Sequence, residues 1–268
     1  MEIEAATIKK FDRLLEILKE MQSVVLAFSG GVDSTFLLKA VKESGMHALA
    51  VTAYSETMPE RELRFAEDMA KLIGIEHRVI KTDEMSNPDF VSNPRDRCFY
   101  CKDELFSKLL DAARAEGYRY VIDGSNSDDL SDWRPGRQAA VKHGVRSPLV
   151  EACLSKDEIR ELSKAMGLPT WSKPASPCLS SRFPYGVKIT KDALKRVEMS
   201  EEFLKGLGFN EFRVRNYNNT ARIEVKAEEI EMLLDKKLRE LIVKQLKDLG
   251  FKYVTVDIEG FRSGKLNE

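Results

Sequence analysis

The sequence predicts an α/β protein with a doubly wound parallel sheet, followed by a smaller C-terminal α+β domain. Apolar runs suited to buried parallel strands alternate with helical stretches over the first part of the chain. Shorter, alternating strands and helices replace them after residue 190. At 268 residues the chain exceeds one typical domain. We therefore expect two domains, residues 1–185 and 186–268.

The first elements are a helix, a buried strand and a glycine loop. Residues 5–21 place apolar side chains at intervals of three and four, which predicts an amphipathic helix. Residues 24–28 are wholly apolar, as in a strand buried on both faces, and a helix should follow over 34–44. The same alternation predicts strands near 47–53, 75–80 and 120–122, with helices near 60–73 and 99–116.

The connecting segments carry turn signals. Residues 82–97 hold two Asn-Pro pairs and few apolar residues, which predicts a surface loop. Ser155, with Glu158 at the capping-box position, should begin a helix that ends near Gly167. Residues 173–184 contain three prolines and no periodicity, so we expect an active-site loop or a linker.

The C-terminal part has the pattern of a compact α+β domain. We expect a helix over 190–207, strands over 212–217 and 221–226, a helix over 227–249 and a last strand over 253–258.

Charge and hydropathy exclude some functions. The 43 Lys and Arg residues nearly balance 44 Asp and Glu, which argues against a surface built to bind nucleic acid. No apolar run reaches the roughly 18 residues that cross a bilayer. The first four residues are acidic and apolar, unlike a secretory signal. We expect a cytoplasmic protein with neither a nucleic-acid nor a membrane partner.

The loop of residues 29–34 reads Ser-Gly-Gly-Val-Asp-Ser between a buried strand and a helix. Its glycines let the backbone approach phosphate oxygens, its serines can donate hydrogen bonds, and its aspartate can hold Mg²⁺. It lacks the lysine of the common nucleotide phosphate loop and the glycine spacing of the dinucleotide fingerprint. A turn without a ligand is the alternative. The expected ATP-binding residues here are Ser29, Gly30, Gly31, Asp33 and Ser34, with Asp33 as the Mg²⁺ ligand.

This loop resembles the signature of the ATP-pyrophosphatase superfamily. The resemblance implies that ATP binds at the carboxyl edge of the sheet, that an oxygen of the substrate is adenylated, and that pyrophosphate is released. It also implies that residues 123–129 complete the nucleotide site, although a solvated loop is the alternative. The further nucleotide-binding residues expected are Gly124, Asn126, Asp128 and Arg134, the last to neutralise pyrophosphate.

Three cysteines stand out. Cys98 and Cys101 form a Cys-x-x-Cys at a helix start, where the helix dipole favours a thiolate; a zinc half-site, a redox pair and chance all remain open. Cys178 lies in the proline-framed loop, and three thiolates suit an iron-sulfur cluster with one open iron. Cys153 is expected to be a small buried residue.

Longer motifs resemble one family within that superfamily. Pro-Ala-Ser-Pro-Cys-Leu-Ser-Ser-Arg followed by Pro-Tyr-Gly, Asp-Asp-Leu-Ser-Asp-Trp-Arg-Pro-Gly, and Glu-Gly-Phe-Arg-Ser-Gly near the C-terminus look like the LarE family. The resemblance implies an ATP-dependent sulfur transferase of nickel-pincer nucleotide biosynthesis. Its substrate would be pyridinium-3,5-biscarboxylic acid mononucleotide, whose carboxylate is adenylated and then converted into a thiocarboxylate for the cofactor of lactate racemase.

The family implies two sources of sulfur. In one branch the cysteine matched by Cys178 gives up its own sulfur and becomes dehydroalanine. In the other it joins a Cys-x-x-Cys to hold a [4Fe-4S] cluster, and an extra sulfide is transferred. Because Cys98, Cys101 and Cys178 are all present, we hypothesise the cluster, with sacrifice of Cys178 as the alternative.

The resemblance also indicates substrate residues. Arg213 and Arg215 lie two apart on a predicted strand, so they share a face that could bind a phosphate or carboxylate, or simply face solvent. A glutamate on the preceding helix points to Glu201, although Glu202 is adjacent. The expected catalytic residues are Cys178, Glu201, Arg213 and Arg215.

Ser180 and Arg182 flank the thiol and are expected to contact the nucleotide, whereas Arg262 in the terminal motif has no assigned role. The family implies a homo-oligomer, of which a hexamer is one form, and transient contact with other nickel-pincer biosynthesis proteins. Two other functions stay open: a tRNA thiolation enzyme, and a nucleotide-binding protein without chemistry whose Cys-x-x-Cys holds zinc. The first would need basic clusters, which are absent.

Overall fold

The computed structural model describes residues 3–131 and 134–262. The chain forms two compact units: the first comprises Met1–Glu84 and Asp96–Ser176, and the second comprises Met85–Arg95 and Pro177–Glu268. The boundary that we predicted after residue 185 differs from this division, because the segment that carries Cys178 belongs to the second unit, as does the short stretch 85–95.

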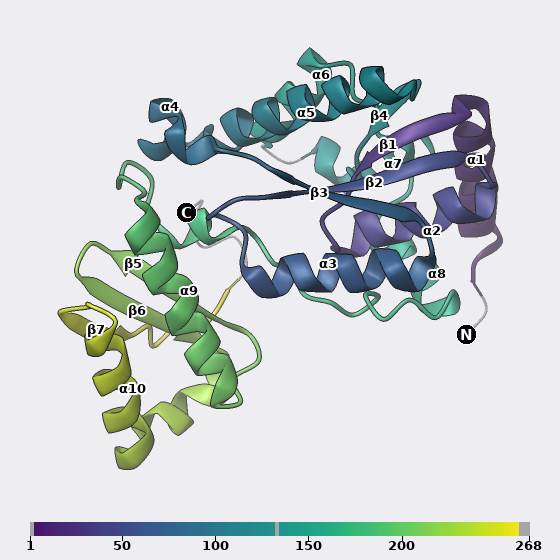
Figure 1. Ribbon diagram of the computed structural model, residues 1–268. Helices are drawn as coiled ribbons and strands as arrows, with labels where there is room; N and C mark the ends of the chain where they lie inside the picture. Colours follow the sequence, from purple (N-terminus) through teal and green to yellow (C-terminus); the bar gives the residue numbers. More distant parts are fainter. Residues whose placement is uncertain (1–2, 132–133, 263–268) are drawn as a thin grey trace. The chain divides into compact units, whose positions relative to one another are not determined.

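The first unit contains a four-stranded parallel sheet (Figure 1). Its strands are β1 (Ser23–Ala27), β2 (His47–Tyr54), β3 (Glu76–Lys81) and β4 (Tyr120–Ile122), in the order β3-β2-β1-β4. The chain moves outward from β1 through β2 to β3 and then returns to the other side of β1. The loops after β1 and β4 therefore diverge at a switch point, where open α/β sheets bind ligands.

Helices cover both faces of this sheet, as the prediction of a doubly wound fold requires. One face carries α1 (Ala5–Met21), α2 (Val32–Ser44), α3 (Glu60–Ile73) and α8 (Lys156–Ala165). The other carries α5 (Arg97–Glu116) and α6 (Pro135–Lys142). Alternate residues of β1 serve the two faces: Val24 and Leu26 enter the first core, and Val25 enters the second. Short helices α7 (Pro148–Glu151) and η2 (Ser127–Leu130) complete the unit.

The stretch predicted as a surface loop, 82–97, is partly helical and partly buried, so that prediction was wrong. It contains η1 (Glu84–Ser86) and α4 (Pro88–Val91). The first Asn-Pro pair starts a helix, because Asn87 accepts the backbone N–H of Asp89 and Pro88 occupies a first-turn position that needs no N–H donor. Asn93 is fully buried and donates its side-chain N–H to the carbonyl of Pro184 at 2.7 Å.

The second unit is built on a three-stranded mixed sheet. It has η3 (Leu179–Arg182), α9 (Lys191–Gly206), β5 (Phe212–Tyr217), β6 (Thr220–Val225) and β7 (Tyr253–Val256). Strand β6 pairs antiparallel with β5 and parallel with β7. The single helix predicted over 227–249 is instead η4 (Ala227–Leu234) and α10 (Lys236–Asp248). Asp235 breaks it, because its carboxylate accepts the N–H of Leu238 and caps α10.

No helix among residues 3–131 and 134–262 is both long enough and apolar enough to cross a membrane.

The capping box predicted at the start of α8 is confirmed. The N–H of Glu158 donates to Ser155 Oγ at 3.3 Å, and the N–H of Ser155 donates to Glu158 Oε2 at 2.8 Å. We expect Ser155→Ala to lower the free energy of unfolding by about 1 kcal/mol, because a helix N–H loses its acceptor. Urea unfolding measures this. Ser107→Ala, at an exposed position inside α5, is the control, and an equal effect of both changes would contradict the role of the cap.

Candidate active site

The phosphate loop is folded tightly between β1 and α2. Gly30 has a φ of +69°, and a Cβ there would lie 3.0 Å from the Cα of Ala66 on α3, so only glycine fits. Ser29 Oγ lies 3.1 Å from Ser34 Oγ, which in turn donates to the carbonyl of Gly31 at 3.3 Å. The N-terminus of α2 thus opens within the loop, as phosphate binding requires.

The loop after β4 packs against the phosphate loop. A Cβ on Gly124 would lie 3.0 Å from the backbone nitrogen of Ser34, so these two predicted residues come together through backbone contact. Asn126 is buried and caps η2: it accepts the N–H of Asp128 at 3.0 Å, while Asp129 accepts the N–H of Asn126 at 3.1 Å. Gly124 permits the close approach, and Asn126 holds the shape of the loop.

Lys156, which the sequence did not single out, links two predicted residues of these loops. Its side-chain Nζ donates to Asp33 Oδ2 at 2.6 Å, and its backbone N–H donates to Asp128 Oδ2 at 2.8 Å. Asp33 Oδ1 is buried and has no hydrogen-bond partner within residues 3–131 and 134–262. Nothing local in the sequence connects Lys156 to Asp33, because 123 positions separate them.

Arg134 is held by a buried carboxylate. Its Nη1 lies 2.7 Å from Asp129 Oδ1, and its side chain is 52% exposed. Burial raises the pKa of Asp129 above its ordinary value, aided by the nearby charge of Asp33, although the N–H of Asn126 and the charges of Arg134 and Lys156 oppose the shift. The guanidinium expected to neutralise pyrophosphate is therefore at the loop surface beside an acid.

Lys173 is a second residue that the sequence did not indicate. Its Nζ donates to the carbonyl of Gly30 at 3.1 Å and to Glu62 Oε2 at 2.9 Å, and it lies 3.6 Å from the centre of the Phe65 ring. Burial raises the pKa of Glu62, but the hydrogen bond and charge of Lys173 outweigh it, so that the pKa is lowered. Lys173 thereby fixes the outer side of the phosphate loop to α3.

The three cysteines are divided between the units. Cys98 is exposed and Cys101 is half-buried in the first turns of α5, three residues apart and thus on one helix face. Cys178 is half-buried in the second unit, directly before η3. In the part of the chain that the structure describes, no three His, Cys, Asp or Glu side chains gather closely enough to bind a metal ion.

Cys153 is exposed, contrary to our prediction that it is buried. It follows the end of α7, where its φ of +55° and the hydrogen bond from its N–H to the carbonyl of Val150 turn its side chain outward.

A buried ion pair supports the Cys178 loop. Arg182 and Glu201 are both 0% exposed, with Nε to Oε1 at 2.8 Å and Nη2 to Oε2 at 2.9 Å. Arg182 Nη1 also donates to the carbonyl of Pro177 at 2.9 Å, and Glu201 accepts the N–H of Val214 on β5 at 3.1 Å. The pair therefore ties the loop, α9 and β5 together.

This burial separates Glu201 from its neighbour, because Glu202 is exposed. Desolvation raises the pKa of Glu201, but the charge and hydrogen bonds of Arg182, the charge of Arg213 and the Val214 N–H outweigh it and lower the pKa. Arg182 was expected to contact the nucleotide; in this structure its guanidinium is instead buried against Glu201. Ser180 is also fully buried.

The two strand arginines have different surroundings. Arg215 is buried; it donates through Nε to Glu224 Oε1 at 2.6 Å and through Nη1 to the carbonyl of Ser181 at 3.2 Å. Arg213 is half-buried, and its guanidinium lies 5.0 Å from the centre of the Phe261 ring. Arg215 thus holds the Cys178 loop, whereas Arg213 retains access to solvent.

The terminal motif supports Arg213. The N–H of Phe261 donates to the carbonyl of Val225 at 2.7 Å, which docks the motif on β6. Arg262 pairs with Glu259 at 3.2 Å. The remaining motif residues Asp132, Trp133, Ser263 and Gly264 lie outside the described residues.

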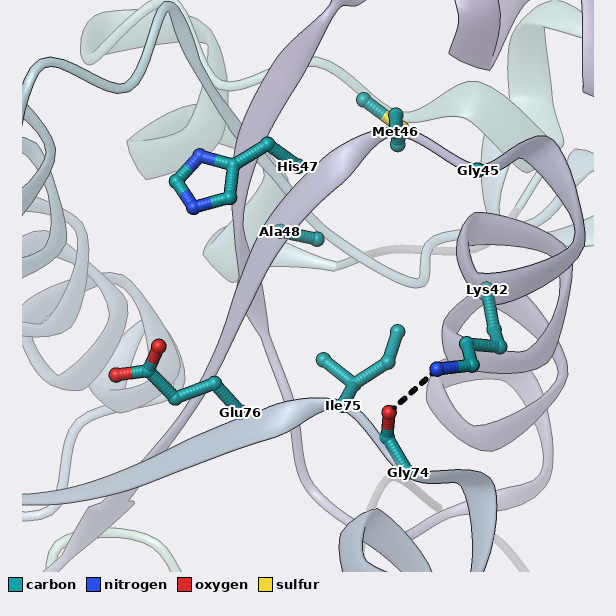
Figure 2. A pocket seen from close by; sticks show the side chains of 8 residues that line it. All are labelled: Lys42, Gly45, Met46, His47, Ala48, Gly74, Ile75 and Glu76. Carbon is teal, nitrogen blue, oxygen red and sulfur yellow. Dashed lines mark hydrogen bonds between the residues drawn. The ribbon is translucent and has the colours of Figure 1, made fainter.

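A separate hollow of about 310 Å³ lies at the opposite edge of the sheet (Figure 2). It is lined at the starts of β2 and β3 by His47 and Glu76, and Lys42 donates to the carbonyl of Gly74 beside it at 2.8 Å. Because the phosphate loop follows the end of β1, this hollow is not part of the candidate site.

Comparisons with known proteins identify the family. Residues 23–91 match the family model described as queuosine biosynthesis protein QueC. The pyridinium-3,5-bisthiocarboxylic acid mononucleotide synthase of Lactiplantibacillus plantarum is 39% identical over 257 residues, 95% of this chain and 92% of that protein. The chain belongs to the LarE family.

Two further relatives differ in how much of the chain they match. An uncharacterized protein of a Synechocystis strain is 48% identical over 260 residues, 96% of this chain and 97% of that protein. A tRNA-specific 2-thiouridylase of a Thermoanaerobacter strain is 26% identical over 230 residues, 69% of this chain and 62% of that protein. The LarE synthase is thus matched over nearly its whole length and the tRNA enzyme over part of it.

The buried pair makes stability depend on pH. At pH 7 we expect Glu201→Gln to lower the free energy of unfolding by about 3 kcal/mol, because Arg182 keeps a buried charge without its partner. The pKa of Glu201 lies below its ordinary 4.5 in the folded protein, so ionisation of Glu201 stabilises the fold above about pH 4.5. This stabilisation is lost as the pH falls through the pKa that Glu201 has in the folded protein.

Urea unfolding of the wild type and Glu201→Gln at pH 7 and at pH 3.5 to 5 measures this. The difference between the two proteins should shrink on acidification. Glu202→Gln, at the exposed neighbour, is the matched control and should change stability by less than about 0.5 kcal/mol. A pH-independent difference would contradict an ionised Glu201.

Proposed function

We propose that this chain is an ATP-dependent sulfur transferase acting on pyridinium-3,5-biscarboxylic acid mononucleotide. It would adenylate a ring carboxylate, release pyrophosphate and convert the acyl adenylate into a thiocarboxylate during nickel-pincer cofactor synthesis. The observation that carries this proposal is the 39% identity to the L. plantarum synthase over 95% of the chain. The phosphate loop of the first unit supports the same chemistry.

The residues at the switch point fit ATP and Mg²⁺. Gly30 and Gly31 leave the backbone open to phosphate oxygens, and α2 presents its first N–H groups there. Asp33 offers a carboxylate whose Oδ1 is buried without a partner within the described residues and whose Oδ2 is held by Lys156. Mg²⁺ would neutralise charge on the phosphates when a substrate carboxylate oxygen attacks the α-phosphorus and pyrophosphate leaves. Arg134 is the cation that would stabilise the departing pyrophosphate.

The second unit would hold the substrate and contribute Cys178 to sulfur transfer. Arg182 and Glu201 act on the loop rather than on the reactants, because both are fully buried and Arg182 binds the carbonyl next to Cys178. We assign them, with Arg215, to positioning the thiol. Arg213 is the strand arginine whose partial exposure suits contact with a phosphate or carboxylate of the substrate.

We also propose that Cys98, Cys101 and Cys178 are ligands of a [4Fe-4S] cluster. Their number and type suit such a cluster, and the exposed Cys98 and half-buried Cys101 share a helix face. When bound, the cluster would supply an extra sulfide on its open iron as the transferred sulfur. Without it, Cys178 Sγ would displace AMP to form a thioester, and β-elimination would release the thiocarboxylate and leave dehydroalanine.

The family further suggests a cytoplasmic homo-oligomer that works with other nickel-pincer biosynthesis proteins. A tRNA thiolation enzyme remains the second candidate, because a tRNA-specific 2-thiouridylase is 26% identical over 69% of the chain. The net charge of −1 gives that candidate no support.

Pyrophosphate release tests the enzyme proposal. With Mg²⁺, ATP and pyridinium-3,5-biscarboxylic acid mononucleotide, the wild type should release pyrophosphate, and Asp33→Asn should lower kcat at least about 100-fold, since a metal ligand is lost. Asp157→Asn, at an exposed position on α8, is the control. If no pyrophosphate appears, the proposal fails; release that requires unmodified tRNA instead would favour the thiolation enzyme.

The fate of Cys178 tests the sulfur source. Protein purified without oxygen should contain iron and labile sulfide, form thiocarboxylate over several turnovers, and keep an intact Cys178 by mass spectrometry. Cys178→Ala should release pyrophosphate but form no thiocarboxylate, because activation precedes sulfur transfer. One turnover per chain, with H₂S lost from Cys178 and no iron bound, would overturn the cluster in favour of sacrifice.

A further inference from the structure

Lys156 joins the two loops that flank the phosphate site. As the first residue of α8, it has a backbone fixed by the Ser155 capping box. Its N–H donates to Asp128 Oδ2 at 2.8 Å in the loop after β4. Its Nζ reaches Asp33 Oδ2 at 2.6 Å in the loop after β1. The backbone and the side chain of one residue therefore each hold one loop.

The side chain of Lys156 is a partly exposed cation. It is 35% exposed and ends four methylene groups from the backbone, whereas Asp33 is 23% exposed and lies in the first turn of α2. The ammonium can rotate toward solvent while the N–H of Lys156 stays bound to Asp128. Lysine suits such a role, because its charge is compact and its stem is flexible.

Charge prevents Lys156 and Mg²⁺ from sharing Asp33. A divalent ion at Asp33 Oδ2 would lie within a few ångströms of the ammonium, where like charges repel strongly away from bulk water. Asp33 Oδ1 has no partner in the described residues but is buried, so an arriving metal must approach the carboxylate through Oδ2, the oxygen that Lys156 holds. Metal binding at Asp33 therefore requires the ammonium to leave.

We propose that Lys156 is a positioning residue that takes the place of Mg²⁺ on Asp33 while the site is empty and withdraws when Mg²⁺ and ATP bind together. This inference rests on the proposed ATP-binding function of the loop. Lys156 keeps Asp33 oriented toward the site and opposes binding of a bare metal ion. The phosphates of ATP, which add oxygen ligands, make the exchange favourable.

Electron paramagnetic resonance of Mn²⁺ tests the exchange without turnover. Each protein is titrated with Mn²⁺ at saturating α,β-methylene-ATP, which cannot transfer AMP because its α- and β-phosphorus atoms are joined by carbon. Lys156→Met should bind Mn²⁺ about threefold to fivefold more tightly than the wild type, the effect of removing one partly exposed competing ion pair. Lys156→Arg, which keeps a cation near Asp33, should stay within about twofold of the wild type.

The matched control is Lys10→Met. Lys10, on α1, pairs at 2.6 Å with Glu158 on α8, the helix that begins with Lys156, but contacts neither loop of the site through that pair. Asp33→Asn should lose the spectrum of protein-bound Mn²⁺. Unchanged or weaker Mn²⁺ binding by Lys156→Met would overturn the proposal, as would retained binding by Asp33→Asn. Lys156→Gln replaces Lys156→Met if the latter does not fold.

Failure of the proposed function gives a different result. If wild type and variants show the expected Mn²⁺ affinities but no pyrophosphate forms with the pyridinium nucleotide, the exchange stands and the substrate assignment falls. If pyrophosphate forms but Lys156→Met binds Mn²⁺ like the wild type, only the exchange falls.

Discussion

The close backbone packing of two loops at the switch point is the constraint on which the first unit depends. Gly124 lies so near the Ser34 nitrogen that no Cβ fits without displacement of the backbone, and Gly30 is equally close to α3. These contacts exist because β4 returns to the free side of β1. They place the phosphate loop, the start of α2 and the acids of the β4 loop at one edge of the sheet.

The second unit uses buried charge where apolar packing would be simpler. Replacing a buried ion pair with apolar residues is often neutral or favourable, so the Arg182–Glu201 pair needs another reason to exist. Its hydrogen bonds supply one. The guanidinium binds the carbonyl beside Cys178, and the carboxylate binds a strand N–H, so the pair sets the path of a loop that has little regular structure. Apolar side chains could not specify these directions.

Charged side chains also hold the phosphate loop in place. Lys173 holds the carbonyl of Gly30 from outside, and Lys156 holds Asp33 from the side of the β4 loop. Two cations thus stabilise the loop that we propose binds an anion and its metal. Lys173 is largely covered and lies over the Phe65 ring, whereas Lys156 is more exposed, which is why we assign exchange to Lys156 alone.

The sequence by itself determined the strands, most helices and the tight turn of residues 29–34 between β1 and α2, because these depend on local periodicity and on glycines next to a buried strand. It failed where a local signal has two outcomes. Asn87-Pro88 starts a helix instead of a loop, and Asp235 divides the segment that periodicity predicted as one helix. Cys153 has a left-handed backbone conformation, which turns its side chain outward.

Only the tertiary structure decided which polar residues act through others. Glu201 and Glu202 are alike in sequence, yet burial against Arg182 separates them. Lys156 meets Asp33 across 123 positions, and no local pattern encodes that contact. Ion pairs between distant segments depend on how layers and strands are arranged, whereas helices, strands and glycine turns depend on neighbours along the chain.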